Sequence, residues 1–312
     1  MRGPERRRAN IKLNREYFEK LDRQLELIPL SYDKAFKSTF KSNLNILKNI
    51  LNASLPITIS EEDKISILDS EMPIINKKEH AQIVDIFVVI NNTIYIDIEM
   101  NRSKFENVFE RNTEYKNRMS NVIFEKGESL KELKTKRLYQ LNLNASPNEE
   151  ILEDTIVLYG LTTKKIYSSN ESTIVKSLER YRELYYNGVK DEEVLWFTML
   201  TARSFSELYE LASQILDEKE LKRLMEASIN MSKDGFVLHA WQKEKMDALV
   251  KYNEIKEATD KGKAEGKAEG IKENTIEIAK NLLKENVDVE TISKATGLTA
   301  ENIQKLSEKG SV

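Results

Sequence analysis

The feature that most constrains the fold is the segment 82–101, QIVDIFVVINNTIYIDIEMN, in which two apolar runs flank Asn91 and Asn92. Successive side chains of a strand point to opposite faces, and apolar residues recur at alternate positions of both runs. Asparagine is common in the tight turns that join antiparallel strands. The segment therefore predicts a β-hairpin, and pairing about the turn brings Asp85 of the first run next to Glu99 of the second.

Two carboxylates side by side on half-buried strands are destabilising unless positive charge lies between them. A divalent metal is the natural counter-charge, because Mg²⁺ binds oxygen ligands, commonly one or two carboxylates, and lowers the pKa of a bound water. Asp85 and Glu99 are therefore candidate metal ligands. The pattern alone leaves a second interpretation open, in which the acids lie on the solvent face of an ordinary antiparallel hairpin.

Composition excludes several other kinds of site. The chain has 312 residues, no cysteine and two histidines, which excludes disulfides, thiolate metal sites, a thiol nucleophile and a histidine-based metal centre. Charged residues make up 32%, but the net charge is only -3, so any nucleic-acid surface has to be local. No apolar run approaches the ~20 residues of a membrane span, and the start of the chain has no apolar signal-peptide core. We therefore expect a protein of the reducing cytoplasm that contacts no membrane.

Periodicity predicts an α/β core. A helix is expected over 31–55, where apolar residues recur at helical spacing between Ser31 as the N-cap and Pro56 as the stop. The other expected elements are a strand over 65–75 leading into the hairpin, a helix over 104–125, strands over 137–143 and 155–162, and a helix over 172–187 that ends at Gly188. Helices and strands that follow one another in this way form layered domains.

Five short motifs follow one another along this core: YDKAFKSTF (32–40), VDIFV (84–88), IDIEMN (96–101), RNTEY (111–115) and YQLNLN (139–144). In this order they resemble successive motifs of the PD-(D/E)XK nuclease family transposases, also called recombination-promoting nucleases. The resemblance continues through a helical segment over 191–258, the repeat GKAEGKAEGIKE (262–273) and a tail with ATGLTAENIQKL (295–306). It thus extends over most of the chain.

The resemblance implies a PD-(D/E)XK restriction-endonuclease-like α/β core with a helical C-terminal extension. It also implies a DNA endonuclease that uses Mg²⁺, for which Mn²⁺ can substitute. Asp85 matches the first acid of the motif and Glu99 the second, and both would bind metal. Asn101 matches the position that lysine usually holds in PD-(D/E)XK nucleases in general. Asp33 would be an auxiliary acid, although an acid in the first turn of a helix also interacts favourably with the helix dipole.

Two basic residues are expected to contact the substrate on the same resemblance. Arg111 would lie near the active site and hold Glu99 or a phosphate; the alternative is a surface residue of an amphipathic helix. Lys78 would contact a phosphate; the alternative is an exposed lysine in a turn.

Asn101 is a departure from the family, whose members commonly carry glutamine at this position. The asparagine amide can orient water or phosphate, but it supplies no positive charge and has a shorter reach than glutamine. Catalysis that is weak or lost is therefore one outcome. Two alternatives to an active enzyme stay open: a degenerate nuclease that binds DNA, and a protein-interaction module built on a nuclease fold.

The expected organisation is a basic N-terminal arm over 1–30, a nuclease-like domain over 31–190, a helical segment over 191–258, a Gly/Lys/Glu hinge over 259–273 and a small helical tail over 274–312. Glycine at every fourth residue and like charges at i,i+4 predict that a helix frays in the hinge. The tail resembles a helix-turn-helix, with Thr299 as an N-cap. Balanced charge in its last helix favours packing or homo-oligomerisation over DNA reading.

Overall fold

The structure, a computed structural model, describes residues 13–68, 85–102, 108–124, 129, 134–145 and 151–308. The chain divides into two compact units, Met1–Trp241 and Gln242–Val312. Among the helices of the described part, none combines the length and the apolar composition that crossing a membrane requires.

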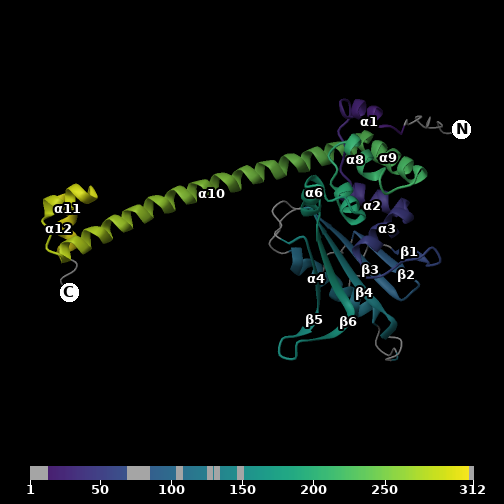
Figure 1. The fold of residues 1–312 in the computed structure, drawn as a ribbon, viewed down its shortest axis with the longest axis horizontal. Coiled ribbons are helices and arrows are strands. Elements are labelled where there is room, and N and C mark those ends of the chain that lie inside the picture. Colours follow the sequence, from purple (N-terminus) through teal and green to yellow (C-terminus); the bar gives the residue numbers. More distant parts are fainter. Residues whose placement is uncertain are drawn as a thin grey trace. The chain divides into compact units, whose positions relative to one another are not determined.

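A mixed sheet of six strands forms the centre of the larger unit in the described part of the chain (Figure 1). The strands are β1 (Ile65–Leu68), β2 (Ile86–Ile90), β3 (Ile94–Asn101), β4 (Arg137–Asn144), β5 (Glu153–Gly160) and β6 (Lys165–Ser177). They lie in the order β1-β2-β3-β4-β6-β5. β1, β2 and β3 pair antiparallel, β3, β4 and β6 are parallel neighbours, and β5 pairs antiparallel with β6. The parallel step from β3 to β4 needs a crossover, which contains α4 (Val108–Ile123).

The β2–β3 hairpin has the register that the sequence predicts. Ile86 pairs with Ile98, so the same register continued by one residue places the two acids of the hairpin opposite each other. Asn91 and Asn92 turn the chain with φ angles of 51° and 57°. Asparagine tolerates this left-handed region better than most residues do, because its short polar side chain bonds to the local backbone.

Helices cover both faces of the sheet. One face shares a hydrophobic core with the helices α1 (Arg15–Asp22), α2 (Asp33–Ser42), α3 (Leu44–Ser54), α6 (Leu178–Tyr186), α7 (Glu192–Leu200), α8 (Phe205–Ala212) and α9 (Glu218–Lys233). The opposite face carries α4, where Met119 and Ile123 pack against Leu138 of β4. The expected α/β core is confirmed. The helices of the expected segment 191–258 share that core as far as α9, because their apolar side chains pack in the same cluster as the sheet.

The first helix expected from the sequence is two helices, α2 and α3, which are separated at Asn43. Asn43 leaves helical geometry with φ -133° and ψ 73°, and its side-chain amide donates to the carbonyl of Thr39 at 2.6 Å. Tyr32 and not Ser31 is the N-cap of α2. The N–H of Ser31 instead donates to the carbonyl of Leu200 at 2.8 Å, which connects this segment to α7.

The helix expected over 172–187 begins later, at Leu178, because residues 165–177 form β6. Ile174 and Val175 are β-branched and pair with the central strand β4. This pairing decides the structure of a short segment whose apolar pattern is compatible with either type of element. Gly188 follows α6 with a φ of 96°, a C-terminal conformation that favours glycine.

The sequence predicts a basic arm over 1–30, but from residue 13 onward the chain is folded and contains α1. Asn14 caps α1 by accepting the N–H of Tyr17 at 2.8 Å, and Phe18 is completely buried. The ring of Phe18 stacks on Tyr209 of α8 with centroids 5.0 Å apart. The apolar residues of this segment therefore fold it into the core although its other face is charged.

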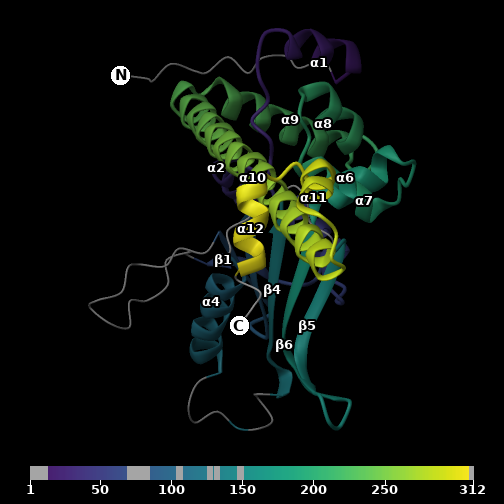
Figure 2. The same cartoon turned by 90° about the vertical axis from the view of Figure 1, so that its left-hand side faces the viewer.

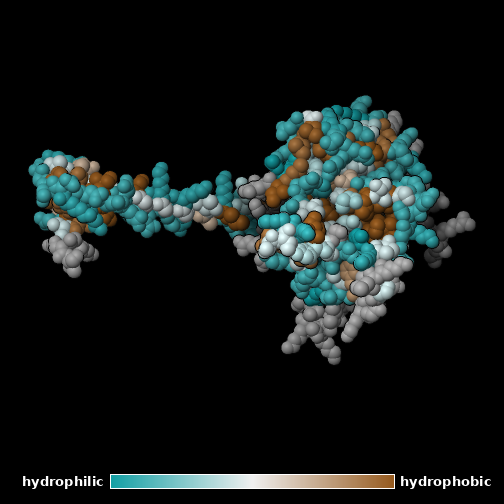
Figure 3. Space-filling model, turned by 60° about the horizontal axis from the view of Figure 1, so that its bottom comes forward, coloured by the Kyte–Doolittle hydropathy of each residue, from teal (hydrophilic) through white to brown (hydrophobic). Residues whose placement is uncertain are grey.

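The segment 259–273, expected to be a frayed helix or a hinge, is helical in the structure, because these residues lie inside one continuous helix, α10 (Gly235–Lys284). The alanine, lysine and glutamate residues between the glycines are strong helix formers, and Lys261 approaches Glu265 to 3.9 Å at i,i+4. All residues from 242 to 274 are exposed, and the visible side of this stretch is mostly hydrophilic (Figure 3).

The smaller unit ends in three helices packed together: the end of α10, α11 (Val289–Thr296) and α12 (Ala300–Glu308) (Figure 2). Ala279, Ile292 and Ile303 are completely buried between them. Gly297 ends α11 with a φ of 72°. Thr299 accepts the N–H of Asn302 at 3.3 Å, so the expected N-cap of the last helix is present.

Candidate active site

The polar face of β3 is covered and not exposed to solvent. Asp97, Glu99 and Asn101 alternate along this face and are 0%, 3% and 5% exposed. The start of α4 lies over them, since its residues Arg111 and Asn112 both donate hydrogen bonds to Asn101. This burial contradicts the interpretation of the acids as the solvent face of an ordinary hairpin.

Asp85 lies directly before β2 and meets Glu99 across the hairpin. The backbone N–H of Asp85 donates to Oε1 of Glu99 at 3.4 Å, and Oδ2 of Asp85 accepts the N–H of Met100 at 2.8 Å. The two acidic side chains are 13% and 5% exposed. The hairpin thus brings together, in a largely buried place, the two acids that the sequence singles out.

A lysine that the sequence reasoning missed reaches the same place. Lys37 of α2 places Nζ 2.9 Å from Oδ1 of Asp85 and 2.7 Å from Oδ1 of Asp33. Asp33 is therefore linked to Asp85 through Lys37, and its own side chain is 53% exposed. Opposite charges at i,i+4 were a signal for the Asp33–Lys37 pair, but the contact with Asp85 depends on the packing of α2 near the hairpin.

Asn101 is held from two sides. Its Nδ2 donates to Oδ1 of Asn144 at 3.0 Å, and its Oδ1 accepts from Arg111 at 2.9 Å. The guanidinium of Arg111 also lies 3.9 Å from Oε2 of Glu99 and 5.8 Å from the ring centroid of Tyr115. Arg111 is therefore engaged with the acid that the sequence expects it to contact, and it is not a free surface residue of α4.

A row of amides on β4 was also missed. The parallel register sets three β4 amides beside three β3 side chains: Gln140 beside Asp97, Asn142 beside Glu99 and Asn144 beside Asn101. Gln140 donates to Oδ2 of Asp97 at 2.9 Å, and Asn112 donates to Asn142 at 2.8 Å. The alternation in YQLNLN was the available signal, since it places three amides on one strand face.

Burial and the negative charge of neighbouring acids raise the pKa values of Asp85, Asp97 and Glu99. Burial raises the pKa of Glu99 to about 9, the charges of Asp97 and Asp85 add to the shift, and Arg111 opposes it. Burial also raises the pKa of Asp97 to about 7, although the hydrogen bond from Gln140 opposes that shift. The pKa of Asp85 is raised by burial too. The positive charge nearby is therefore insufficient for three ionised carboxylates.

The donor set fits a hard divalent cation. Asp85 and Glu99 present carboxylate oxygens, and Oδ1 of the fully buried Asp97 has no hydrogen-bond partner in the described part of the chain. Within that part, no group of three or more His, Cys, Asp or Glu residues is arranged to hold a metal. Mg²⁺ commonly takes only one or two protein carboxylates and completes its shell with water and phosphate. Asp85 and Glu99 match that requirement.

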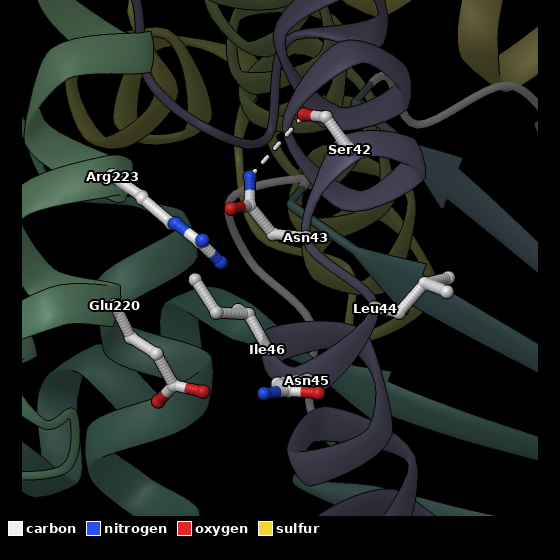
Figure 4. Close-up of a pocket in the computed structure, with 7 residues that line it drawn as sticks. All are labelled: Ser42, Asn43, Leu44, Asn45, Ile46, Glu220 and Arg223. Atoms are coloured by element: carbon white, nitrogen blue, oxygen red, sulfur yellow. Dashed lines mark hydrogen bonds between the residues drawn. The ribbon is translucent and has the colours of Figure 1, made fainter.

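Lys78, expected to contact phosphate, lies outside the described residues. A pocket of about 220 Å³ lies at the start of α3, where Glu220 and Arg223 extend from α9 toward it (Figure 4). None of the residues predicted for the site lines this pocket, and it is therefore separate from the acid cluster.

Two family models match the chain. The model of the PD-(D/E)XK nuclease family transposases matches residues 30–258, which include the described candidate residues and the sheet. The model of the C-terminal HTH domain of the Rpn/YhgA-like nuclease family matches residues 272–308, which include α11 and α12. Neither a search of curated proteins nor a search of solved structures finds a match.

Proposed function

The chain belongs to the PD-(D/E)XK nuclease family transposases, and from this premise we propose that it is a metal-dependent DNA endonuclease that serves DNA recombination. The observation that carries the proposal is the buried pair of Asp85 and Glu99, whose pKa values are raised where they lie. Such crowding destabilises the folded protein when no cation is bound, and it is frequent at functional sites.

Asp85 and Glu99 would hold Mg²⁺, or Mn²⁺ in its place. The bound ion supplies an activated water and a counter-charge for the phosphate. Asn101 orients the water or the phosphate, because an amide nitrogen has two N–H groups and Asn144 engages one of them. Arg111 fixes Asn101 and, with a half-exposed side chain, has further N–H groups for a phosphate oxygen.

Covalently closed circular plasmid tests the proposal, because a circle has no end for an exonuclease to attack. The purified protein is expected to nick or linearise the plasmid with Mg²⁺ or Mn²⁺ and to leave it intact in EDTA. Intact plasmid with both metals, together with retained DNA binding, would favour the degenerate nuclease. Loss of both cleavage and DNA binding would favour the protein-interaction module.

For the smaller unit we propose DNA contact through its helix-turn-helix, in place of the packing role that its balanced charge favoured. The match over residues 272–308 supports this assignment. Removal of 272–312 is expected to weaken DNA binding while leaving the cleavage rate at saturating DNA unchanged. The opposite result is an unchanged DNA affinity together with a molar mass in sedimentation that falls by more than the mass of the deleted residues. It would show that the tail serves homo-oligomerisation.

A further inference from the structure

Lys37 is a cation of the candidate site that comes from an unexpected element. Its Nζ lies 2.9 Å from Oδ1 of Asp85 and 2.7 Å from Oδ1 of Asp33. The Lys37 side chain is 24% exposed, whereas that of Asp33 is 53% exposed. The ammonium group therefore lies between the largely buried Asp85 and the half-exposed Asp33.

The motif position that holds lysine in PD-(D/E)XK nucleases in general is neutral in this chain, as it is in relatives that carry glutamine there. Asn101 occupies it, and Asn101 bonds to Asn144 and Arg111. Among the described residues, the cations that contact the two acids are Arg111, 3.9 Å from Glu99, and Lys37 beside Asp85. The site thus has one cation on the Glu99 side and one on the Asp85 side.

The ammonium of Lys37 has more donors than its two acidic partners in the described part of the chain engage. A lysine ammonium has three N–H donors, and Asp33 and Asp85 engage two of them. Hydrolysis of a phosphodiester increases the negative charge on the phosphate oxygens, and a preorganised cation at that position stabilises the transition state. Asp33 fixes the ammonium from its solvent side without having to enter the buried cluster.

We propose that Lys37 is the catalytic cation of this site, supplied from α2 in place of a lysine on β3, and that it contacts the phosphate under attack. The inference rests on the proposed nuclease function. It makes Asp33 a positioning residue, which acts by orienting Lys37, and not an acid that binds the metal.

The opposing account is structural, in which Lys37 only holds Asp85 in place. The two accounts predict opposite effects on metal affinity. A cation beside a metal ligand repels the metal, so its removal should tighten metal binding if Lys37 acts on the substrate. If Lys37 instead maintains the conformation of Asp85, its removal should weaken metal binding and cleavage together.

The test compares wild-type protein with Lys37→Met and with Lys41→Met, an exposed lysine of the same helix, as the matched control. Three quantities are measured: Mn²⁺ affinity without DNA by calorimetry, single-turnover plasmid cleavage, and DNA affinity in Ca²⁺. We expect Lys37→Met to cleave about 100-fold more slowly while binding Mn²⁺ at least as tightly as wild type. Lys41→Met should match wild type in all three. Parallel losses of metal affinity and cleavage in Lys37→Met, or unchanged cleavage, would overturn the inference.

Thermal unfolding establishes that the variants are folded, and Lys37→Gln replaces Lys37→Met if the latter is unfolded at the assay temperature. If wild type itself cleaves nothing with either metal, the proposed function fails independently of Lys37. DNA affinity in Ca²⁺ then decides the inference: a loss of about tenfold in Lys37→Met supports a phosphate contact, and an affinity equal to wild type rejects it.

Discussion

Burial favours the protonated form of Glu99, whereas binding a metal requires its ionised form. Its side chain is 5% exposed, and burial together with Asp97 and Asp85 raises its pKa to about 9. In the described part of the chain, the cation nearest to Glu99 is Arg111, which is half exposed and lies 3.9 Å away. Arg111 therefore offsets the negative charge of Glu99 only in part. The folded protein without a bound cation therefore favours the protonated form of Glu99 at neutral pH.

This shift predicts how stability depends on pH in EDTA. The pKa of Glu99 is about 9 in the folded protein against an ordinary 4.5, so the folded state binds the proton more tightly. The stabilising contribution is present below 4.5 and is lost as the pH rises through about 9. Glu99→Gln has no such proton to lose and should show a flatter decline of melting temperature between these limits. Glu110→Gln, an exposed acid on α4, is the control, and a decline equal in all three proteins would contradict the assignment.

Asn101 tests whether an amide is sufficient at the third position of the motif. Asn101→Gln should keep or raise the cleavage rate, because it restores the longer reach found in most of the family. Asn101→Ala should lower the rate by about tenfold or more, since water or phosphate then lacks its partner. Asn101→Lys adds a cation where charge develops and should not be slower than Ala. Single-turnover plasmid cleavage measures all four proteins, and equal rates would make Asn101 a spectator.

At the scale of elements, local patterns predicted what lies within one hairpin and not what separate elements bring together. Alternation, which is clearer in β3 than in β2, and the two asparagines predicted the β2–β3 register, and with it the approach of Asp85 to Glu99. The amides of β4 and the ammonium of Lys37 reach the site through parallel pairing and helix packing, which no local pattern encodes. The same limit explains why residues 172–177 were expected in a helix. They belong to β6 because they pair with β4.

The end of β6 supplies a test of such packing. The side chain of Lys176 is 7% exposed and bonds to Glu153 of β5, to Glu193 of α7 and to Tyr181. Lys176→Met should lower the free energy of unfolding by about 1 kcal/mol, because the half-exposed Glu153 and Glu193 lose the partner that they share. Urea denaturation measures the change, and Lys165→Met at the exposed start of β6 is the control. A change within the error of that control would show that the network is dispensable.

At the scale of the whole molecule, the two family matches divide the chain much as its two compact units do. The first match ends at residue 258 and the second begins at 272, while the units meet between Trp241 and Gln242. The continuous helix α10 contains both boundaries, so the glycine repeat that predicted a hinge is part of a helix. Three glycines cost helix stability, about 1 kcal/mol each, but they do not block the backbone hydrogen bonds as proline does.

The proposed nuclease function requires Asp85 and Glu99 to act as one metal-dependent cleavage site. It is tested most directly by plasmid cleavage with Mg²⁺ by wild type, Asp85→Asn, Glu99→Gln and the control Glu110→Gln, with melting temperatures recorded for each. Both site variants are expected to lose cleavage by about 1000-fold or more, because the metal loses a carboxylate ligand. They should melt no lower than wild type, because Asp85→Asn removes one of the crowded acids and Glu99→Gln replaces an acid that is already mainly protonated without metal. Glu110→Gln should cleave as wild type does. Site variants that cleave at the wild-type rate, or that lose cleavage only because they unfold, would show that Asp85 and Glu99 do not form this site.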